Sequence, residues 1–366
     1  MIHLTLHQTE ADFDAQKDNF VKPHVAYVVE TSSVDYEPYV KDYSQEYLTF
    51  VATESGTFQF SYTINYSLDD GETWTSLASY TDSPVVQTRS KILWKATRTP
   101  SSFGVGTFSS TANFTVEGNP MSLLFGDNFK GQTSLSGKNY AFKYLFSGST
   151  TVISIENLSL PATTLAYNCY SSMFYGCTSL TTVPSDMLPA TTLADYCYAS
   201  MFFSCTSLTT APSLPATTLA SRCYESMFNG CTSLTTAPSL PATTLADYCY
   251  ASMFFSCTSL TTAPSLPATT LATFCYGQMF YDCTSLTTAP SLPATTLATS
   301  CYLLMFYGCT SLNSITCLAT DISASNCTNN WVSAVSVSGT FTKAASMNDW
   351  TSGTSGIPNG WTVQDA

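Results

Sequence analysis

Between residues 160 and 316 the chain repeats one motif six times, and this repeat restricts the possible folds more than any other feature. Each copy reads Leu-Pro-Ala-Thr-Thr-Leu-Ala, two variable residues, Cys-Tyr, two more, Met-Phe, two more, and Cys-Thr-Ser-Leu. Five copies are 26 residues long, and the first has 28 because Asp186 and Met187 are inserted. A fixed period of this size is typical of a solenoid, in which stacked units share one core.

The fixed and variable positions of the copies predict the structure of one coil. Counted from the opening leucine, positions 5, 9, 10, 13, 14 and 17 are almost constant, whereas positions 7, 8, 11, 12, 15 and 16 vary. Both sets step by about four, which predicts a short helix with one buried and one exposed face. The following Thr-Ser-Leu-Thr-Thr-Ala-Pro predicts a short strand that ends at proline. Strands stack about 4.8 Å apart and helices about 8–10 Å apart, so we expect a curved solenoid with its strands inside.

The fourteen cysteines follow the repeat, because twelve of them form six pairs whose members are eight residues apart. Two columns of like residues suggest packing positions, so we expect free, buried thiols that behave as small apolar groups. Disulfides along a column are not expected, since neighbouring helices would hold the sulfur atoms too far apart. Zinc is not expected either, because it favours closely spaced cysteines or nearby histidine, and the histidines are only His3, His7 and His24. We expect no metal and no cofactor.

Charge and hydropathy exclude several classes of partner. The formal net charge is -13, and ten of the twelve Lys and Arg residues precede residue 144. Nucleic acid is therefore not an expected partner, since phosphate contacts need cations. No run of about 18 apolar residues is present, so we expect no membrane span, and the start lacks the basic and apolar regions of a signal peptide. The almost uncharged repeats suit packing and contacts with hydroxyl groups or sugars.

The chain around the repeats divides into segments of different composition. Segments rich in β-formers, separated by Gly-containing turns, predict an immunoglobulin-like β-sandwich before the repeats. A degenerate copy at residues 140–146 and a partial copy near Cys327 predict caps at the two ends. The expected class is α+β with a repeat region. Its expected parts are an N-terminal anchor or docking segment at 1–44, the sandwich at 45–120, an N-terminal cap at 121–159, the solenoid at 160–317 and a C-terminal cap at 318–366.

The repeat resembles a known family. The stretch Phe-x-x-Cys-Thr-Ser-Leu followed by Leu-Pro, at residues 202–215, is similar to the BspA-like leucine-rich repeat, although family units are shorter and read Ala-Phe where this chain reads Met-Phe. The resemblance covers residues 140–332 and implies a curved leucine-rich-repeat solenoid. Members of this family are commonly surface proteins that mediate attachment, which implies a bacterial cell-surface adhesin as one possible function.

The N-terminal segment resembles a different group of proteins. Lys-Pro-His-Val-Ala-Tyr-Val-Val at residues 22–29, followed by Val-Asp-Tyr at 34–36, is similar to the leading segments of head-fibre-type structural proteins of crAss-like phages of gut bacteria. The resemblance implies a virion protein that is made in the host cytoplasm, docks on other virion proteins and forms a homo-oligomer, for example a trimer. The residues that would dock are Pro23, His24, Val25, Tyr27 and Tyr36.

One motif suggests catalysis. Residues 67–74 read Ser-Leu-Asp-Asp-Gly-Glu-Thr-Trp and match the Asp-box pattern that sialidases carry in several copies. An Asp box is itself a hairpin, in which Asp and Gly form the turn and Trp packs. Because this chain has one box and no other catalytic set, we expect no enzyme and keep a glycan-active enzyme as an alternative.

Aromatic residues recur at the variable positions of the repeat. They could contact a sugar or a protein, or they could be partly buried against the next coil, and both interpretations stay open. The leading hypothesis is a non-enzymatic phage virion protein, of the fibre or decoration type, that displays the repeats for attachment to a host surface protein or glycan. The candidate surface consists of Tyr167, Tyr175, Tyr196, Phe203, Tyr248, Phe255, Phe274, Tyr281 and Tyr307.

Overall fold

The computed structural model describes residues 26, 27, 38, 39 and 41–366. The chain divides into two compact units, the first ending at Tyr43 and the second beginning at Ser44. In the first unit, strand β1 (Ala26–Tyr27) pairs antiparallel with β2 (Pro38–Tyr39). Tyr27 therefore lies in a two-residue strand. The candidate docking residues Pro23, His24, Val25 and Tyr36 lie outside the described residues.

The second unit, residues 44–366, is mostly β-structure and turns, with few helices. Its short helical elements are the 3-10 helix η2, whose first residue still belongs to the first unit, the helix α2 and the 3-10 helix η3. The bounds are η2 Tyr43–Gln45, β3 Leu48–Ala52, β4 Phe58–Phe60, β5 Ile64–Ser67, β6 Thr75–Leu77, β7 Lys91–Lys95, β8 Phe108–Ser110, β9 Phe114–Gly118, α2 Ser122–Phe125, η3 Gly126–Phe129, β10 Val152–Leu158, β11 Ser314–Cys317, β12 Thr340–Lys343 and β13 Thr362–Asp365.

The part of this unit before the repeats, which we call the sheet region (residues 44–158), contains a six-stranded mixed sheet of order β10-β9-β3-β7-β5-β6 and a two-stranded sheet of β4 and β8. Its core is aromatic. The ring of Phe50 on β3 lies 5.4 Å from Phe58 on β4 and 4.7 Å from Phe108 on β8. Strands of both sheets thus contribute to one core, as a sandwich requires.

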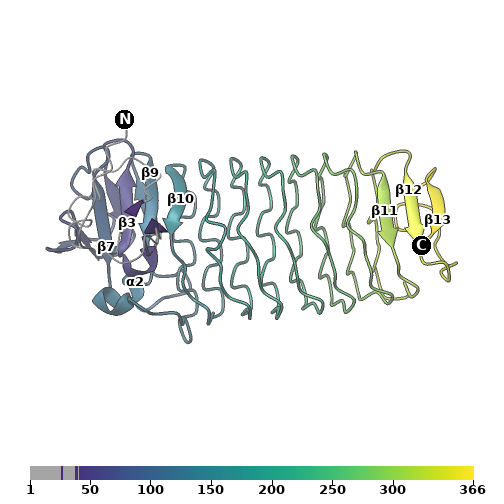
Figure 1. Ribbon diagram of the computed structural model, residues 1–366, viewed down its shortest axis with the longest axis horizontal. Helices are drawn as coiled ribbons and strands as arrows, with labels where there is room; N and C mark the ends of the chain where they lie inside the picture. The colour runs from purple at the N-terminus through teal and green to yellow at the C-terminus, as the bar shows by residue number, and fades with distance from the viewer. Residues whose placement is uncertain (1–25, 28–37, 40) are drawn as a thin grey trace. The chain divides into compact units, whose positions relative to one another are not determined.

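The sheet region continues directly into the repeats. Strand β10 pairs parallel with β9 at the edge of the six-stranded sheet, and Figure 1 shows the first coils following beside it. Phe146 joins the two cores, because its ring lies 5.7 Å from Phe50 and stacks at 5.4 Å on Phe174, the first phenylalanine of the repeats. The buried residues form one continuous cluster.

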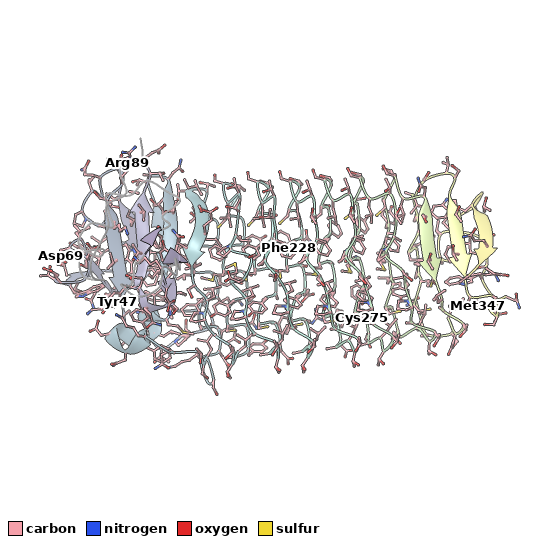
Figure 2. All side chains as sticks on the ribbon, viewed as in Figure 1. Tyr47, Asp69, Arg89, Phe228, Cys275 and Met347 are labelled. Carbon is pink, nitrogen blue, oxygen red and sulfur yellow. The ribbon has the colours of Figure 1, made fainter. Side chains whose placement is uncertain are left out.

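The repeats (residues 160–317) form successive coils, which we call the coil stack. In every copy the side chains of Cys, Tyr, Met, Phe and Cys at the constant positions are at most 2 % exposed, which confirms these five predicted core positions. The sixth, the leucine at position 5, is buried in three copies and only partly buried in the other three, at Leu165, Leu219 and Leu271. Equivalent residues form columns. Phe228 of the phenylalanine column, labelled in Figure 2, lies 5.7 Å from Phe202 and 5.8 Å from Phe254, with almost parallel rings.

The prediction of a short helix in each copy is wrong, since no residue from 160 to 317 is helical. In the second copy the amide groups alternate between two kinds of partner. Cys197 N donates within the coil to Ala194 O at 3.2 Å, whereas Tyr198 N donates to Cys223 O of the next coil at 3.0 Å. Every fourth residue, such as Tyr196 and Ser200, has a positive φ of about 55°. The segment is therefore a chain of tight turns, which has the same four-residue period as a helix.

This correction removes the physical basis of the predicted curvature. The turn segment of each coil is hydrogen-bonded to the next coil, and outside the turns single parallel pairings join Thr192 to Thr218 and Thr236 to Thr262. Adjacent coils are therefore joined by main-chain hydrogen bonds on both segments, and neither segment needs the 8–10 Å spacing of packed helices. The predicted strand after the second cysteine is a full strand, β11, only in the last copy.

All fourteen cysteines are free and buried, as predicted. The stated reason, that neighbouring helices would hold the sulfur atoms too far apart, is wrong, because the coils contain no helices and lie closer together. The thiols of the second column instead donate to main-chain carbonyl groups. Cys205 Sγ lies 3.1 Å from Phe174 O, and Cys231 Sγ lies 3.1 Å from Phe202 O. Each thiol thus helps to hold one coil against its neighbour.

The stack ends at a small parallel sheet of order β11-β12-β13. Trp331 stands in the partial copy that follows, where its ring stacks 6.1 Å from Tyr302 and its Nε1 donates to Gly356 O at 2.8 Å. Figure 1 shows the three strands beside the last coils. Among the described residues, no helix is both long enough and apolar enough to cross a membrane.

Candidate ligand-binding surface

The nine aromatic residues of the candidate surface fall into two rows on the turn segments of the coils. Members of a row occupy equivalent or adjacent positions in successive copies, so the stacking of coils places them side by side. We name the rows by their members, including the two polar residues that interrupt them. Row A is Tyr167, Tyr196, Arg222, Tyr248 and Phe274, and row B is Tyr175, Phe203, Asn229, Phe255, Tyr281 and Tyr307.

The rings of row B stack face to face along the coil stack. The ring centres of Tyr175 and Phe203 are 4.7 Å apart with an interplanar angle of 4°. The corresponding values are 4.4 Å and 5° for Phe255 and Tyr281, and 4.6 Å and 12° for Tyr281 and Tyr307. Each ring covers its neighbour, so ring edges rather than ring faces point to solvent. Tyr175 is 40 % exposed and the others are half-buried, which agrees with partial burial against the next coil.

Row A is less regular and contains a cation. Tyr167, which is 39 % exposed, lies edge-on to Tyr196 at 5.6 Å, and Tyr248 stacks on Phe274 at 5.0 Å. Between them, the guanidinium of Arg222 lies 3.9 Å from the ring centre of Tyr248 and 5.6 Å from that of Tyr196. Arg222 thus replaces a ring in the row through cation–π contacts.

Arg222 is also held by an ion pair with Glu225, in which Nη1 lies 2.8 Å from Oε1. The two side chains are 29 % and 27 % exposed, so both remain accessible. Burial opposes the charge of Arg222, but the hydrogen bond and the negative charge of Glu225 outweigh it and raise the pKa of Arg222. The guanidinium therefore stays positive, and the ion pair fixes its direction.

Sequence reasoning placed the aromatic residues but did not assign Arg222, Glu225 and Asn229 to this surface. A signal was present, because the second and fourth copies are identical at residues 194–205 and 246–257, whereas the third copy between them departs from both. The sequence analysis counted Arg222 and Glu225 only as isolated charges, so it did not predict that they form a pair within the aromatic rows. Their contact becomes visible once the coils are stacked.

The Asp box has a complete structural explanation. Asp69 accepts hydrogen bonds from Ser67 Oγ at 2.6 Å and from Thr73 N at 2.9 Å, and these bonds lower its pKa to about 2. Trp74 Nε1 donates to Gly71 O at 2.9 Å, and its ring lies 4.9 Å from that of Tyr47. The carboxylate holds its own turn and the tryptophan packs, as expected for a structural hairpin.

The described residues contain no cluster of three or more His, Cys, Asp or Glu residues that could bind a metal ion. The buried thiols are also poor nucleophiles, because burial raises the pKa of Cys205 and of Cys257 to about 12. At neutral pH such groups are almost entirely protonated.

Comparisons with known proteins add no assignment. The chain matches no protein-family model, and no curated protein matches it in sequence.

Proposed function

We propose that this protein is a non-enzymatic structural protein of a phage virion, of the fibre or decoration type, which displays the coil stack for attachment to a host surface protein or glycan. The observation that carries the proposal is the pair of aromatic rows along the coil stack. Partly exposed aromatic side chains with polar groups between them are the usual anchors of a binding surface.

The character of the stack supports binding by contact area rather than by charge. Between residues 160 and 317 the charged residues are Asp186, Asp195, Arg222, Glu225, Asp247 and Asp282. The turn segments that carry the rows are hydrogen-bonded from coil to coil, which holds the aromatic side chains in place before a ligand arrives. A preorganised surface loses little conformational entropy on binding.

The thiols support assembly in a reducing compartment. All fourteen cysteines are free and buried. Proteins that mature in oxidising compartments tend to form disulfides, whereas cytosolic proteins keep their thiols reduced. A virion protein made in the host cytoplasm fits this pattern. Under this proposal the N-terminal unit docks on other virion proteins, and the chain forms a homo-oligomer such as a trimer.

Two finer statements about the fold belong to the same proposal. We propose that the sheet region is an immunoglobulin-like sandwich, which the aromatic core shared by its two sheets supports. We also propose kinship of the coil stack with BspA-like leucine-rich repeats, in which chains of turns replace the helical segments.

The experiment that tests the proposal is mass spectrometry of purified phage particles together with binding of the full chain to host cells. We expect the chain in the particles, and we expect a Tyr281→Ala, Tyr307→Ala double variant to bind cells more weakly than the parent. A double variant at the exposed positions Thr287 and Thr288, away from the aromatic rows, is the control. Absence from particles combined with labelling on a bacterial surface would instead support the adhesin.

A further inference from the structure

The third coil of the stack lies between two copies of the same coil. Residues 194–205 of the second copy and 246–257 of the fourth have one sequence, Ala-Asp-Tyr-Cys-Tyr-Ala-Ser-Met-Phe-Phe-Ser-Cys. The third copy, at 220–231, keeps the buried Cys, Tyr, Met, Phe and Cys. All of its departures lie outside these columns, at Ser221, Arg222, Glu225, Asn229 and Gly230. Core packing therefore does not require the departures.

The departures interrupt both aromatic rows at the same coil. In row B, Asn229 stands between Phe203 and Phe255, and in row A, Arg222 stands between Tyr196 and Tyr248. Phe203 stacks on Tyr175 and Phe255 stacks on Tyr281, each through one face. Their other faces turn toward the third coil, where the described structure has no ring to cover them.

The interruption in row B is one ring position wide. Phe203 and Phe255 lie two coils apart, and in the neighbouring phenylalanine column the two successive ring separations are 5.7 Å, from Phe202 to Phe228, and 5.8 Å, from Phe228 to Phe254. Intact parts of row B hold adjacent rings 4.4–4.7 Å apart, so the interruption leaves room for one ring. The side chain of Asn229 is smaller than that of a phenylalanine, and the residue is only partly buried. Its amide makes no side-chain hydrogen bond within the described part of the chain.

The polar groups around the interruption suit hydroxyl groups. Arg222 and Glu225 form an ion pair that is more than a quarter exposed, so both can bind a ligand without breaking the pair. Asp195 and Asp247 accept hydrogen bonds from Ser221 N at 3.0 Å and from Thr273 N at 2.9 Å. These three carboxylates and one guanidinium give a local charge of -2, which disfavours an anionic ligand.

We propose that the third coil, with Phe203 and Phe255 on its two sides, is the binding site for a neutral saccharide. One pyranose ring stands between the two phenylalanine rings and places its C–H faces against them. The sugar hydroxyls bond to the amide of Asn229 and to the Arg222–Glu225 pair. This inference rests on the proposed attachment function and narrows it to one coil and one class of ligand.

The test removes the site while using only residues that the neighbouring coils already carry. The triple variant Arg222→Tyr, Glu225→Ala, Asn229→Phe gives the third coil the side chains of its two neighbours at these positions. Both rows are then continuous, so we expect thermal unfolding no earlier than in the parent. The matched control is the double variant Thr287→Ala, Thr288→Ala, which changes exposed residues of the coil stack away from the aromatic rows.

The full chain is applied to immobilised neutral oligosaccharides of glucose, galactose, mannose and N-acetylglucosamine, and to sialylated oligosaccharides. We expect the parent to bind at least one neutral oligosaccharide and no sialylated one. We expect the triple variant to lose about tenfold or more in affinity, because two ring contacts and the polar partners are lost together. The Thr287→Ala, Thr288→Ala variant should bind like the parent.

Three results would overturn the proposal. Equal affinity of parent and triple variant for the same saccharide would place the site elsewhere. Binding to host cells without binding to any neutral saccharide, including binding only to a host protein, would contradict the ligand class but leave the attachment function standing. Failure of the parent to bind host cells at all would overturn the attachment function itself.

Discussion

The sheet region and the coil stack bury aromatic residues in different ways. In the sheet region Phe50 contacts Phe58, Trp94, Phe108, Phe114 and Phe146, at interplanar angles between 42° and 78°. In the coil stack, Phe254 contacts the equivalent phenylalanines of the two neighbouring copies, Phe228 and Phe280, at interplanar angles of 5° and 11°. One core is a set of unique contacts, whereas the other is a single contact repeated by translation.

This difference decides how far a defect spreads. In a stack of repeats each coil contacts only its two neighbours, so stability is roughly a sum of local terms. In the sheet region one ring joins strands that are distant in sequence, so its loss affects the entire sheet region. Thiol labelling can follow the opening of the repeats separately from the sheet region, because every cysteine lies between residues 169 and 327.

The largest expected effect is the protection of the thiols in the coil stack. Burial raises the pKa of Cys205, Cys223 and Cys309 to about 12, and an aromatic disulfide reagent attacks only the thiolate. We expect labelling of the native chain to be roughly a thousandfold slower than labelling of the denatured chain, since it requires the coils to open. Mass spectrometry of the labelled chain over time measures this ratio.

The control for this experiment is the pH. Because labelling of the native chain proceeds through the opened state, raising the pH from 7 to 9 should speed native and denatured labelling by similar factors and leave the ratio between them large. Labelling of the native chain at pH 9 as fast as that of the denatured chain would show that the cysteine columns are open to solvent. Such a result would contradict the description of the coil stack as a closed, solvent-excluding core.

The next largest effect is expected for Phe254→Ala. Phe254 is fully buried, and truncation of such a ring costs about 3–5 kcal/mol in the free energy of unfolding. We expect hydrogen exchange to increase in the third to fifth coils while the sheet region keeps its protection. Phe50→Ala, the matched change in the sheet region, should cost a similar amount but expose the sheet region as a whole. If the two substitutions increased hydrogen exchange over equally large parts of the chain, the contrast between local stability in the coil stack and collective stability in the sheet region would be wrong.

The comparison also explains which parts of the fold the sequence could predict. The buried columns were predictable, since six copies in one chain separate constant Phe254-type positions from variable ones. The turns were not, because helices and four-residue turns share a period. Residues with positive φ, such as Tyr196, Arg222 and Phe274, are not glycines and carry no local signal for that backbone. The hydrogen bonds that favour turns join residues about 26 positions apart.

The candidate surface was predictable in part for the same reason. All nine aromatic positions follow from the variable positions of the repeat, but their division into two rows depends on how the coils align. Arg222 was missed because a single cation in an uncharged region resembles an isolated surface charge. Its role depends on Tyr196 and Tyr248, which lie in other coils.

A smaller effect is expected for Tyr281→Ala in row B. The ring of Tyr281 stacks between Phe255 at 4.4 Å and Tyr307 at 4.6 Å but is half-buried. Stacked aromatic pairs contribute about 0.5–1.5 kcal/mol beyond their buried area, so the loss should be well below that of Phe254→Ala. Urea unfolding of Tyr281→Ala, Phe255→Ala and the double variant gives the coupling between the two rings. A coupling of zero would show that row B is an alignment without mutual stabilisation.

The smallest effect is expected in the Asp-box hairpin of the sheet region, and it depends on pH. The hydrogen bonds from Ser67 and Thr73 lower the pKa of Asp69 from 3.8 to about 2. Since the folded-state pKa lies below the unfolded-state value, the charged form stabilises the hairpin above about pH 4, and this contribution disappears as the pH falls through about 2. Asp69→Asn should therefore lower the unfolding midpoint at pH 7 and make little difference at pH 2. The protection of the thiols should be the same in both chains at each pH, because the hairpin lies outside the coil stack. A midpoint difference that persists unchanged at pH 2 would mean that the carboxylate's charge does not hold this turn, and that the hairpin depends on the packing of Trp74 instead.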